Sequence, residues 1–461
     1  MTKKVYFIGI GGIGMSALAR FCKHEGYEVA GYDRTKSELT AELIREGIDI
    51  HFDDCLSAIP ESFRRGDVSV IYTPAIPDNS IELNYFRDTG NKPVKRSAAL
   101  GMIAKDRTVL AVAGTHGKTT ISTMLAHIMT VAADGCTAFL GGISKNYNSN
   151  LILSNSKWMV AEADEYDRSF LQLYPSVAIV TAADADHLDI YGSEAELKKA
   201  FGDFVAQIIP DGALILKKDT LIPADKLRCR TYSYSYDNAE SDFYASNISS
   251  EQGFFKFDVH TPEGTVADCL LGLPGRVNVE NAVAAIAASS LAGADIYRIR
   301  NALETFSGVK RRFDIQVNTP ECVYIDDYAH HPEELRASIT SVRLMFPGRK
   351  ITGIFQPHLY SRTRDFAAGF AESLSLLDEL ILMDIYPARE LPIEGVTSGI
   401  IFDRVRIKNK VMCRDGQLID LLAGRDIRDM DVIMTLGAGD IDRFVNPITN
   451  LLKTKISNPD C

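Results

Sequence analysis

Short apolar runs alternate with helical patterns in the N-terminal part of the chain. The apolar run 5–8 ends at a glycine, and apolar residues then recur at helical spacing through 15–22. Further short apolar runs follow at 27–32, at 68–72 and near 93–94. Strands that alternate with helices are typical of βαβ units, so this region is predicted to form a parallel sheet covered by helices.

The same pattern starts again in the middle of the chain. The apolar run 108–113 leads directly into a glycine-containing loop, and an apolar helical pattern follows it. Residues 228–270 differ, because aromatic and polar residues alternate there in the way that is typical of antiparallel strands. Two further strands and an alanine-rich helix are predicted at 158–161, 177–180 and 278–292.

A third alternating region follows Gly308. Its predicted elements are a helix from Pro332, a second helix near 365–377, and strands at 323–325, 351–355, 380–383 and 431–436. The predicted fold class is therefore α/β, with three domains in series. Their predicted boundaries are 1–106, 107–307 and 308–461.

Composition places the chain among globular proteins. Its 461 residues are 46% hydrophobic and 24% charged, which excludes a disordered or fibrous chain and suits about three domains. The formal net charge of −11 and the lack of a basic run argue against a nucleic-acid partner. No apolar stretch reaches the roughly 18 residues of a membrane span, and the N-terminal apolar run is too short for a signal peptide. The eight Cys show no C-x-x-C spacing, so buried, reduced thiols in a cytoplasmic protein are predicted.

The first glycine loop carries the pattern G-x-G-x-x-G. Its glycines are Gly9, Gly11, Gly12 and Gly14, and Asp33 ends the next predicted strand. Glycines let the backbone approach a diphosphate, and the start of a helix attracts an anion. Taken alone, the pattern is typical of NAD or FAD binding. A nucleotide sugar would suit the same features, and a tight turn without a ligand is the third interpretation.

The second glycine loop, G-T-H-G-K-T at 114–119, follows a strand and opens a helix. Position 112 is a valine, so the strict G-x-x-x-x-G-K-[ST] pattern lacks its first glycine. The groups that do the chemistry are present. Lys118 can reach the β- and γ-phosphates of ATP, Thr119 can bind Mg²⁺, and the backbone amides of the loop can cradle the phosphates.

Acidic residues follow two strands of the same region. Glu162 comes at the end of the predicted strand 158–161, where a Mg²⁺ ligand beside a phosphate loop is expected. His187 follows the strand 177–180 within the sequence A-D-H-L-D. It is a candidate metal ligand or orienting group, and a structural histidine is the alternative.

The third region is rich in Arg and His after its strands. The clusters are V-K-R-R-F (309–313), D-D-Y-A-H-H-P (326–332) and Q-P-H-L-Y-S-R-T-R-D (356–365). Arg binds phosphates and carboxylates through paired hydrogen bonds, although a solvated charged face is the alternative. A dehydrogenase has no need of a G-K-T loop, and a simple P-loop ATPase has no need of the first loop. The combination favours a ligase that uses ATP on a substrate with a nucleotide handle.

Seven motifs, in order along nearly the whole chain, resemble those of the Mur ligases. They are G-I-G-G-I-G-M-S (9–16), G-T-H-G-K-T-T (114–120), A-E-A-D-E (161–165), A-D-H-L-D (185–189), L-P-G-R-V-N-V-E-N-A (273–282), D-D-Y-A-H-H-P (326–332) and Q-P-H-L-Y-S-R-T-R-D (356–365). The resemblance implies a Rossmann-like, UDP-sugar-binding domain at 1–106. It implies a P-loop ATPase-like, Mg²⁺–ATP-binding domain with added antiparallel strands at 107–307. A Rossmann-like, amino-acid-binding domain would occupy 308–461.

The resemblance also implies an amide-forming step of peptidoglycan precursor synthesis. ATP would phosphorylate the lactyl carboxylate of UDP-N-acetylmuramate, and L-alanine would then attack the acyl phosphate, which releases phosphate. The first and last motifs favour this reaction over that of the sister enzyme that attaches a recycled murein tripeptide. An NAD-dependent oxidoreductase is a remote alternative. The implied cofactors are ATP and Mg²⁺, with Mn²⁺ as an alternative, and the chain would act as a monomer or dimer.

Site residues follow from the resemblance, motif by motif. Catalytic roles would fall on Lys118, His187, Arg312 and His330. The UDP-sugar would contact Gly9, Gly11, Gly12, Gly14, Met15, Ser16 and Asp33. ATP would contact Gly114, Thr115, His116, Gly117, Lys118, Thr119, Thr120, Asn278, Asn281 and Asp326. The metal would be held by Thr119, Glu162 and His187, and the amino acid by Tyr328, His330, His358, Arg362 and Arg364.

Three positions depart from the family pattern, and one of them is Tyr166, where Ser is common. Other members often have a basic residue after the His of Q-P-H, whereas Leu359 stands here, so carboxylate binding would depend more on Arg362 and Arg364. Several sister enzymes carry a carbamylated lysine after A-D-H. Phe201 occupies that position in this chain, although Lys198 and Lys199 are close to it.

Overall fold

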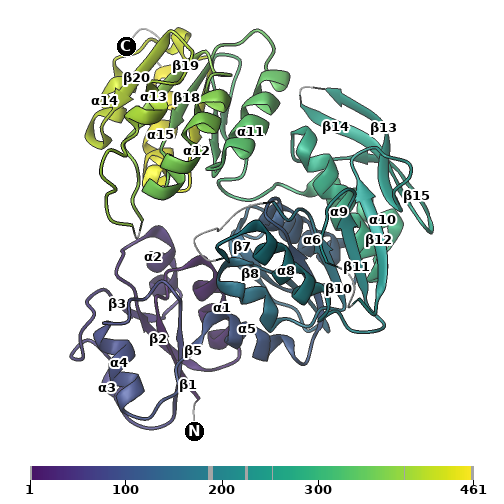
Figure 1. Ribbon diagram of the computed structural model, residues 1–461, viewed down its shortest axis with the longest axis vertical. Helices are drawn as coiled ribbons and strands as arrows, with labels where there is room; N and C mark the ends of the chain where they lie inside the picture. Colours follow the sequence, from purple (N-terminus) through teal and green to yellow (C-terminus); the bar gives the residue numbers. More distant parts are fainter. Residues whose placement is uncertain (1–2, 185–190, 224–226, 252, 389, 458–461) are drawn as a thin grey trace. The chain divides into compact units, whose positions relative to one another are not determined.

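The structure is a computed structural model that describes residues 3–184, 191–223, 227–251, 253–388 and 390–457 (Figure 1). The chain forms two compact units, and each is described here by itself. Unit 1 comprises Met1–Ser249, Lys256–Leu273 and Asn278–Ser307. Unit 2 comprises Ser250–Phe255, Pro274–Val277 and Gly308–Cys461.

Unit 1 begins with a five-stranded parallel sheet in the order β3-β2-β1-β4-β5. Its strands are β1 (Lys4–Ile8), β2 (Glu28–Tyr32), β3 (Asp49–His51), β4 (Val68–Tyr72) and β5 (Val94–Lys95). The helices between and after them are α1 (Ile13–His24), α2 (Glu38–Arg45), α3 (Glu61–Arg64), α4 (Ile81–Asp88) and α5 (Arg96–Ala104). The predicted alternation of strands and helices is confirmed here.

The second sheet of unit 1 has ten strands in the order β15-β14-β13-β12-β11-β10-β6-β9-β7-β8. They are β6 (Thr108–Ala113), β7 (Thr137–Ser144), β8 (Ser149–Ile152), β9 (Trp158–Glu162), β10 (Val177–Val180), β11 (Ala213–Lys217), β12 (Arg230–Ser235), β13 (Phe243–Glu251), β14 (Phe254–Thr261) and β15 (Gly264–Leu270). The helical elements are α6 (Lys118–Ala132), the 3₁₀ helix η1 (Tyr166–Gln172), α8 (Glu194–Val205), α9 (Arg276–Leu291) and α10 (Ile296–Thr305). β6 pairs in parallel with β10 and β9, which places the phosphate-loop strand inside the sheet.

The predicted antiparallel addition at 228–270 is confirmed only in part. β14 and β15 pair antiparallel, but β12 runs parallel to both β11 and β13. Alternation of polar and apolar residues reports which face of a strand is buried and not the direction of its neighbour, so the pattern could not separate the two cases. The antiparallel hairpin of β7 and β8 was not predicted.

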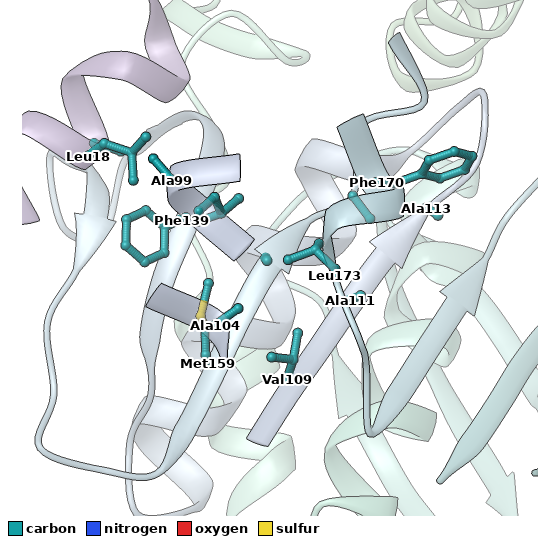
Figure 2. Close-up of a cluster of buried hydrophobic side chains, with 14 of the residues drawn as sticks. Leu18, Ala99, Ala104, Val109, Ala111, Ala113, Phe139, Met159, Phe170 and Leu173 are labelled. Atoms are coloured by element: carbon teal, nitrogen blue, oxygen red, sulfur yellow. The ribbon is translucent and has the colours of Figure 1, made fainter. Parts of the chain in front are cut away.

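One hydrophobic cluster joins the two sheets of unit 1 (Figure 2). Leu18 of α1 and Ala99 of α5 lie beside Phe139 of β7, and Val109 and Met159 come from β6 and β9. Full burial of a Leu, Val, Phe or Met side chain stabilises a fold by about 1.5–3 kcal/mol. The cluster therefore fixes the strands that precede both glycine loops within one unit.

Unit 2 contains a six-stranded sheet in the order β16-β17-β21-β18-β19-β20. Its strands are β16 (Asp314–Asn318), β17 (Val323–Asp327), β18 (Ile351–Phe355), β19 (Glu379–Met383), β20 (Asn409–Cys413) and β21 (Val432–Leu436). Only β16, at the edge of this described sheet, pairs antiparallel. The helices are α11 (Pro332–Met345), α12 (Tyr360–Leu374), α13 (Gly399–Phe402), α14 (Leu418–Ala423) and α15 (Val445–Ser457), with 3₁₀ helices η2 (Asp415–Gln417), η3 (Ile427–Asp429) and η4 (Asp440–Phe444).

The helix predicted near 365–377 begins earlier than expected. α12 starts at Tyr360, directly after Leu359, whose φ of 68° turns the chain into the helix. Such a left-handed residue is rare outside glycine and has no sequence signal. Arg362 and Arg364 therefore lie in the helix and not in a loop.

The predicted three-domain α/β class is confirmed by the three separate sheets, two of which are mixed. Among the described residues, no helix is both long and apolar enough to span a membrane.

Candidate functional site

The phosphate-type loop 114–117 connects β6 to α6. Gly114 has φ +125°, and a Cβ atom on it would lie 2.1 Å from Thr181 Oγ1. Gly117, with φ +79°, precedes the first residue of α6, and a Cβ there would lie 3.0 Å from Asn281 Oδ1. Both conformations favour glycine. The short distances show that the loop packs closely against Thr181 and Asn281 at both of its ends.

The Lys118 side chain lies along this loop, with 13% of it exposed. Nζ donates to Gly114 O at 2.7 Å and to Glu165 Oε1 at 2.7 Å. Burial opposes the charge, but the carboxylates of Glu165, Asp164 and Glu162 outweigh it and raise the pKa of Lys118 to about 12. The loop therefore holds a fixed positive charge.

Thr119 and Glu162 bring two oxygen donors together beside the loop. Thr119 Oγ1 donates to Glu162 Oε1 at 3.1 Å, and the Gly141 amide donates to Glu162 Oε2 at 3.1 Å. A hydroxyl and a carboxylate are the ligand types that suit Mg²⁺ next to a nucleotide. Among the described residues no group of three or more His, Cys, Asp or Glu forms a metal cluster, and the candidate ligand His187 lies outside the described residues.

The remaining residues predicted for ATP are close to the loop. Thr181 Oγ1 donates to His116 O at 2.5 Å, and the Thr115 amide donates to Ala182 O at 3.2 Å. Thr120 is buried in the first turn of α6. Asn281, the neighbour of Gly117, donates from Nδ2 to Asn278 Oδ1 at 3.1 Å, and both asparagines are buried. The structure brings these residues together with Lys118, apart from Asp326, which lies in unit 2.

The first glycine loop connects β1 to α1 in the same way. Gly9 has φ +87°, and a Cβ there would lie 2.5 Å from Thr73 Cγ2. The Gly11 amide donates to Asp33 Oδ2 at 2.8 Å. Gly12 precedes α1 as its N-cap and has φ −65°. The side chain of Asp33 therefore fixes the conformation of the loop by accepting a hydrogen bond from the loop's backbone.

Met15 and Ser16 turn into the protein. Met15 is buried in the hydrophobic cluster of unit 1. Ser16 Oγ donates to Ile13 O at 2.9 Å and accepts from Asn150 Nδ2 at 2.9 Å. Any contact between these two residues and a ligand would use the backbone. Asn150, a fully buried residue of β8, was missed because the sequence carries no sign that the β7–β8 hairpin reaches α1.

Gly14 makes room for an arginine. A Cβ on Gly14 would lie 2.9 Å from Arg96 Nη1 and 3.0 Å from Arg96 Cδ. Arg96 lies in none of the predicted motifs, and its contact with Gly14 was not predicted. A basic pair, Lys95–Arg96, at the junction of a short strand and a helix is the only signal that could have found it.

In unit 2, Asp326 is fully buried at the end of β17. Thr435 Oγ1 donates to Asp326 Oδ1 at 2.6 Å, and Arg311 Nε lies 3.4 Å from Asp326 Oδ2. Burial raises the pKa of Asp326 to about 6, although Arg311 and Thr435 oppose the rise. Asp326 therefore orients Arg311 and has no exposed surface for a ligand.

Two arginines flank the ring of Tyr328. The Cζ atoms of Arg311 and Arg312 lie 5.1 Å and 4.8 Å from the ring centroid. The Tyr328 amide donates to Arg311 O at 2.7 Å, which ties the two segments together. A guanidinium on an aromatic face is held in orientation while its N–H groups stay available.

His330 lies next to this group. Its Nδ1 is 3.0 Å from Tyr328 O and 3.3 Å from Glu334 Oε2. Burial lowers the pKa of His330 to about 4; Glu334 opposes the shift, and Arg362 and Arg312 add to it. The imidazole is therefore neutral near pH 7, and because a carbonyl only accepts, Nδ1 carries the proton.

His358 and Arg362 belong to the same cluster, but Arg364 does not. The rings of His330 and His358 are 6.2 Å apart, and His358 stacks on Tyr386 at 5.8 Å. Arg364 is exposed and donates from Nε to Asp365 Oδ1 at 2.7 Å. The structure thus gathers Arg312, Tyr328, His330, His358 and Arg362 and leaves Arg364 on the surface.

Three family models match the chain in order. They are the "Mur ligase family, catalytic domain" at 4–108, the "Mur ligase middle domain" at 112–289 and the "Mur ligase, glutamate ligase domain" at 311–439.

A UDP-N-acetylmuramate–L-alanine ligase from Parabacteroides distasonis is 51% identical over 458 residues, which cover 99% of this chain and 98% of that protein. The crystal structure of a UDP-N-acetylmuramate-alanine ligase from Thermotoga maritima shares 28% identity at a TM-score of 0.83, covering 98% and 99% of the two chains. A murein peptide ligase from Psychrobacter arcticus has the same fold, with a TM-score of 0.72, 23% identity and 98% of each chain covered. The chain belongs to the Mur ligase family.

Proposed function

We propose that the chain joins L-alanine to the lactyl carboxylate of UDP-N-acetylmuramate and converts ATP to ADP and phosphate. The observation that carries the proposal is the 51% identity over 99% of the chain with a relative named for this reaction. The product, UDP-N-acetylmuramoyl-L-alanine, is a peptidoglycan precursor. A cytoplasmic location and a monomeric or dimeric state stay predictions.

Each of the three proposed domains binds a different substrate. The UDP-sugar binds at 1–106 through the glycine loop and Asp33, ATP binds at 107–307 through the loop 114–120, Asn278 and Asn281, and L-alanine binds at 308–461. Two loops with different chemistry in one unit support this division, because a sugar nucleotide and ATP each need a backbone cradle.

Lys118 neutralises the charge of the γ-phosphate, since its raised pKa keeps it protonated. Thr119 and Glu162 supply oxygen ligands for Mg²⁺, with His187 as a further proposed ligand. The bound ion would draw electron density from the phosphate oxygens, and Mn²⁺ accepts the same ligand types. The chain's own contribution is to hold the hydroxyl and carboxylate 3.1 Å apart.

The reaction has two balanced steps. A lactyl carboxylate oxygen attacks the γ-phosphorus, and the bond from that phosphorus to the bridging oxygen breaks, which releases ADP. The neutral amine of L-alanine then attacks the carbonyl carbon of the acyl phosphate. The amine loses a proton, the carbon–oxygen bond breaks, and phosphate leaves with that electron pair. Both steps bring anionic groups together, so fixed cations lower the barrier.

The cluster of unit 2 suits an amino acid. We assign the alanine carboxylate to Arg362 and Arg312, which form paired hydrogen bonds with carboxylates. Neutral His330 keeps a lone pair on Nε2, which can accept a hydrogen bond from the alanine amine. The rings of Tyr328 and His358 lie beside His330, and Asp326 acts through Arg311. Because Arg364 is exposed, its share in binding would require the side chain to leave Asp365.

The test is phosphate release from ATP in the presence of UDP-N-acetylmuramate and one amine at a time. L-Alanine, L-serine, glycine and the murein tripeptide are compared. Release that requires both the UDP-sugar and L-alanine supports the proposal. Release with the tripeptide but not with L-alanine would transfer the assignment to the recycling reaction. No release with any amine, from a folded protein that binds ATP, would contradict both.

A further inference from the structure

Arg96, the first residue of α5, lies between the first glycine loop and the acidic segment 161–165. On one side its guanidinium covers Gly14 of α1, where a Cβ would lie 2.9 Å from Nη1. On the other side Nη2 lies 3.6 Å from Asp164 Oδ2. The next residue, Glu165, binds Lys118 of the phosphate loop. Arg96 therefore lies against the first glycine loop, and it is connected to the phosphate loop through the segment Asp164–Glu165.

The protein makes little use of this guanidinium. The Arg96 side chain is only 21% exposed and offers five N–H donors. Within the described part of the chain its ion pair is with Asp164, and the 3.6 Å separation is too long for a hydrogen bond. None of its nitrogens is a buried atom without a partner, so solvent reaches the guanidinium and its N–H groups are available to a ligand.

Arg20 shows how a structural arginine at the same helix is satisfied. It lies on α1, and its side chain is 10% exposed. It donates to Glu46, Glu42 and Asn150 at distances between 2.6 and 3.1 Å. Arg20 lies on α1 and Arg96 packs against it. Within the described residues the protein satisfies the donors of Arg20, whereas Arg96 has only the 3.6 Å contact with Asp164.

The first turn of α1 offers backbone amide donors next to Arg96, although three neighbouring amides already have acceptors. The Gly11 amide is taken by Asp33, the Gly12 amide by Gly9 O, and the Ser16 amide by Gly12 O. The amides at the very start of a helix have no intrahelical acceptor and attract anions. Arg96 lies against this first turn at Gly14.

We propose that Arg96 binds an anionic group of the sugar nucleotide at the start of α1, and that position 14 is a glycine because a side chain there would displace Arg96. The proposal rests on the proposed function. The anion is the diphosphate or the lactyl carboxylate, since a guanidinium binds either through paired hydrogen bonds.

Calorimetric titration with three ligands separates the two sources. The ligands are UDP, UDP-N-acetylglucosamine, which lacks the lactyl group, and UDP-N-acetylmuramate. For Arg96→Met we expect an affinity loss of at least about tenfold, because a charge-assisted hydrogen bond is lost. A loss shared by all three ligands identifies the diphosphate as the anion, and a loss confined to UDP-N-acetylmuramate identifies the carboxylate. Arg96→Lys keeps the charge without the fork and should recover part of the affinity.

Arg20→Met is the matched control. It should lower Tm, because it breaks the contacts to Glu42, Glu46 and Asn150, and leave the affinity for UDP within about twofold. Arg96→Met should leave Tm nearly unchanged. Gly14→Ala keeps Arg96 but fills its place, so it should weaken the binding of the same ligands as Arg96→Met.

Two results would overturn the assignment of Arg96, and only the second of them would also overturn the proposed function. If the wild-type protein binds the ligands and Arg96→Met binds all three equally well, Arg96 has no ligand and the proposed function stands. If the wild-type protein binds none of the three, the proposed function fails and the assignment of Arg96 fails with it.

Discussion

The two glycine loops of unit 1 begin alike and differ in where their positive charge comes from. Each follows a buried parallel strand and opens with a glycine of positive φ, Gly9 at +87° and Gly114 at +125°. The loop 114–117 leads into its own cation, Lys118, which Glu165 holds at 2.7 Å. The loop 9–12 leads into a helix without a lysine in its first turn, and Arg96 from α5 lies against that turn instead.

A local sequence motif therefore reveals only the cations that lie within the motif itself. A cation inside the motif is visible in the sequence, and here it is paired with the carboxylate of Glu165. A cation supplied by a distant helix is invisible in the motif. Arg96 reaches Gly14 only because α5 packs beside α1, and within the described residues its charge has only a distant partner in Asp164.

The largest effect is expected from a substitution that alters the second loop alone. Lys118→Ala should lower the rate of phosphate release by at least about 10³-fold, because the γ-phosphate loses its fixed cation. UDP affinity should stay within about twofold, as the first loop is untouched. Since the change strips Glu165 of its partner, the double variant Lys118→Ala/Glu165→Gln controls for stability. Loss of UDP binding by either variant in its folded state would contradict the separation of the loops.

The next prediction compares how much stability is lost when a glycine of each loop is replaced by alanine. Gly114→Ala should lower the free energy of unfolding by about 3 kcal/mol or more, because φ is +125° and the new Cβ would lie 2.1 Å from Thr181 Oγ1. Gly12→Ala should lower it by about 1 kcal/mol or less, since φ is −65° and the nearest atom is 3.6 Å away. Urea denaturation measures both. Equal losses in the two variants would contradict the different backbone conformations assigned to Gly114 and Gly12.

A smaller effect concerns the first loop alone. Asp33→Ala removes the acceptor of the Gly11 amide at 2.8 Å and of the Thr35 amide at 2.9 Å. UDP affinity should fall about tenfold as the loop loses its fixed shape, while the KM for ATP stays the same. Asp88→Ala, at the exposed end of α4, is the control. A rise in the KM for ATP would mean that the loops are not independent.

The last effect is a pH dependence of stability, and it lies in α6, the helix that follows the second loop. His127 of α6 is buried, and burial lowers its pKa to about 4. As pH falls from about 6.5 to 4, the unfolded chain binds a proton that the folded chain does not, so unit 1 should lose up to about 1.4 kcal/mol per pH unit. His127→Gln should remove this contribution in urea titrations between pH 7 and 4.

Local sequence predicted the parts that depend on neighbouring residues. The strand before each loop, the glycines, and the roles suggested for Lys118 and Thr119 follow from short motifs. The start of α12 was wrong because Leu359 adopts a left-handed conformation without a glycine. The Asn150 and Arg96 contacts with α1 were missed because residues distant in sequence make them. The pairing of Lys118 with Glu165 was also missed, since the chain must bend after β9 to bring that carboxylate back.

The most direct test of two loops serving two ligands is a crossed binding measurement. UDP-N-acetylmuramate and ATP are each titrated into the wild-type protein, Lys118→Ala and Arg96→Met. We predict that Lys118→Ala loses affinity for ATP and keeps it for UDP-N-acetylmuramate, whereas Arg96→Met loses affinity for UDP-N-acetylmuramate and keeps it for ATP. If either variant, still folded, loses both ligands or the opposite one, the two loops do not have the separate roles assigned to them.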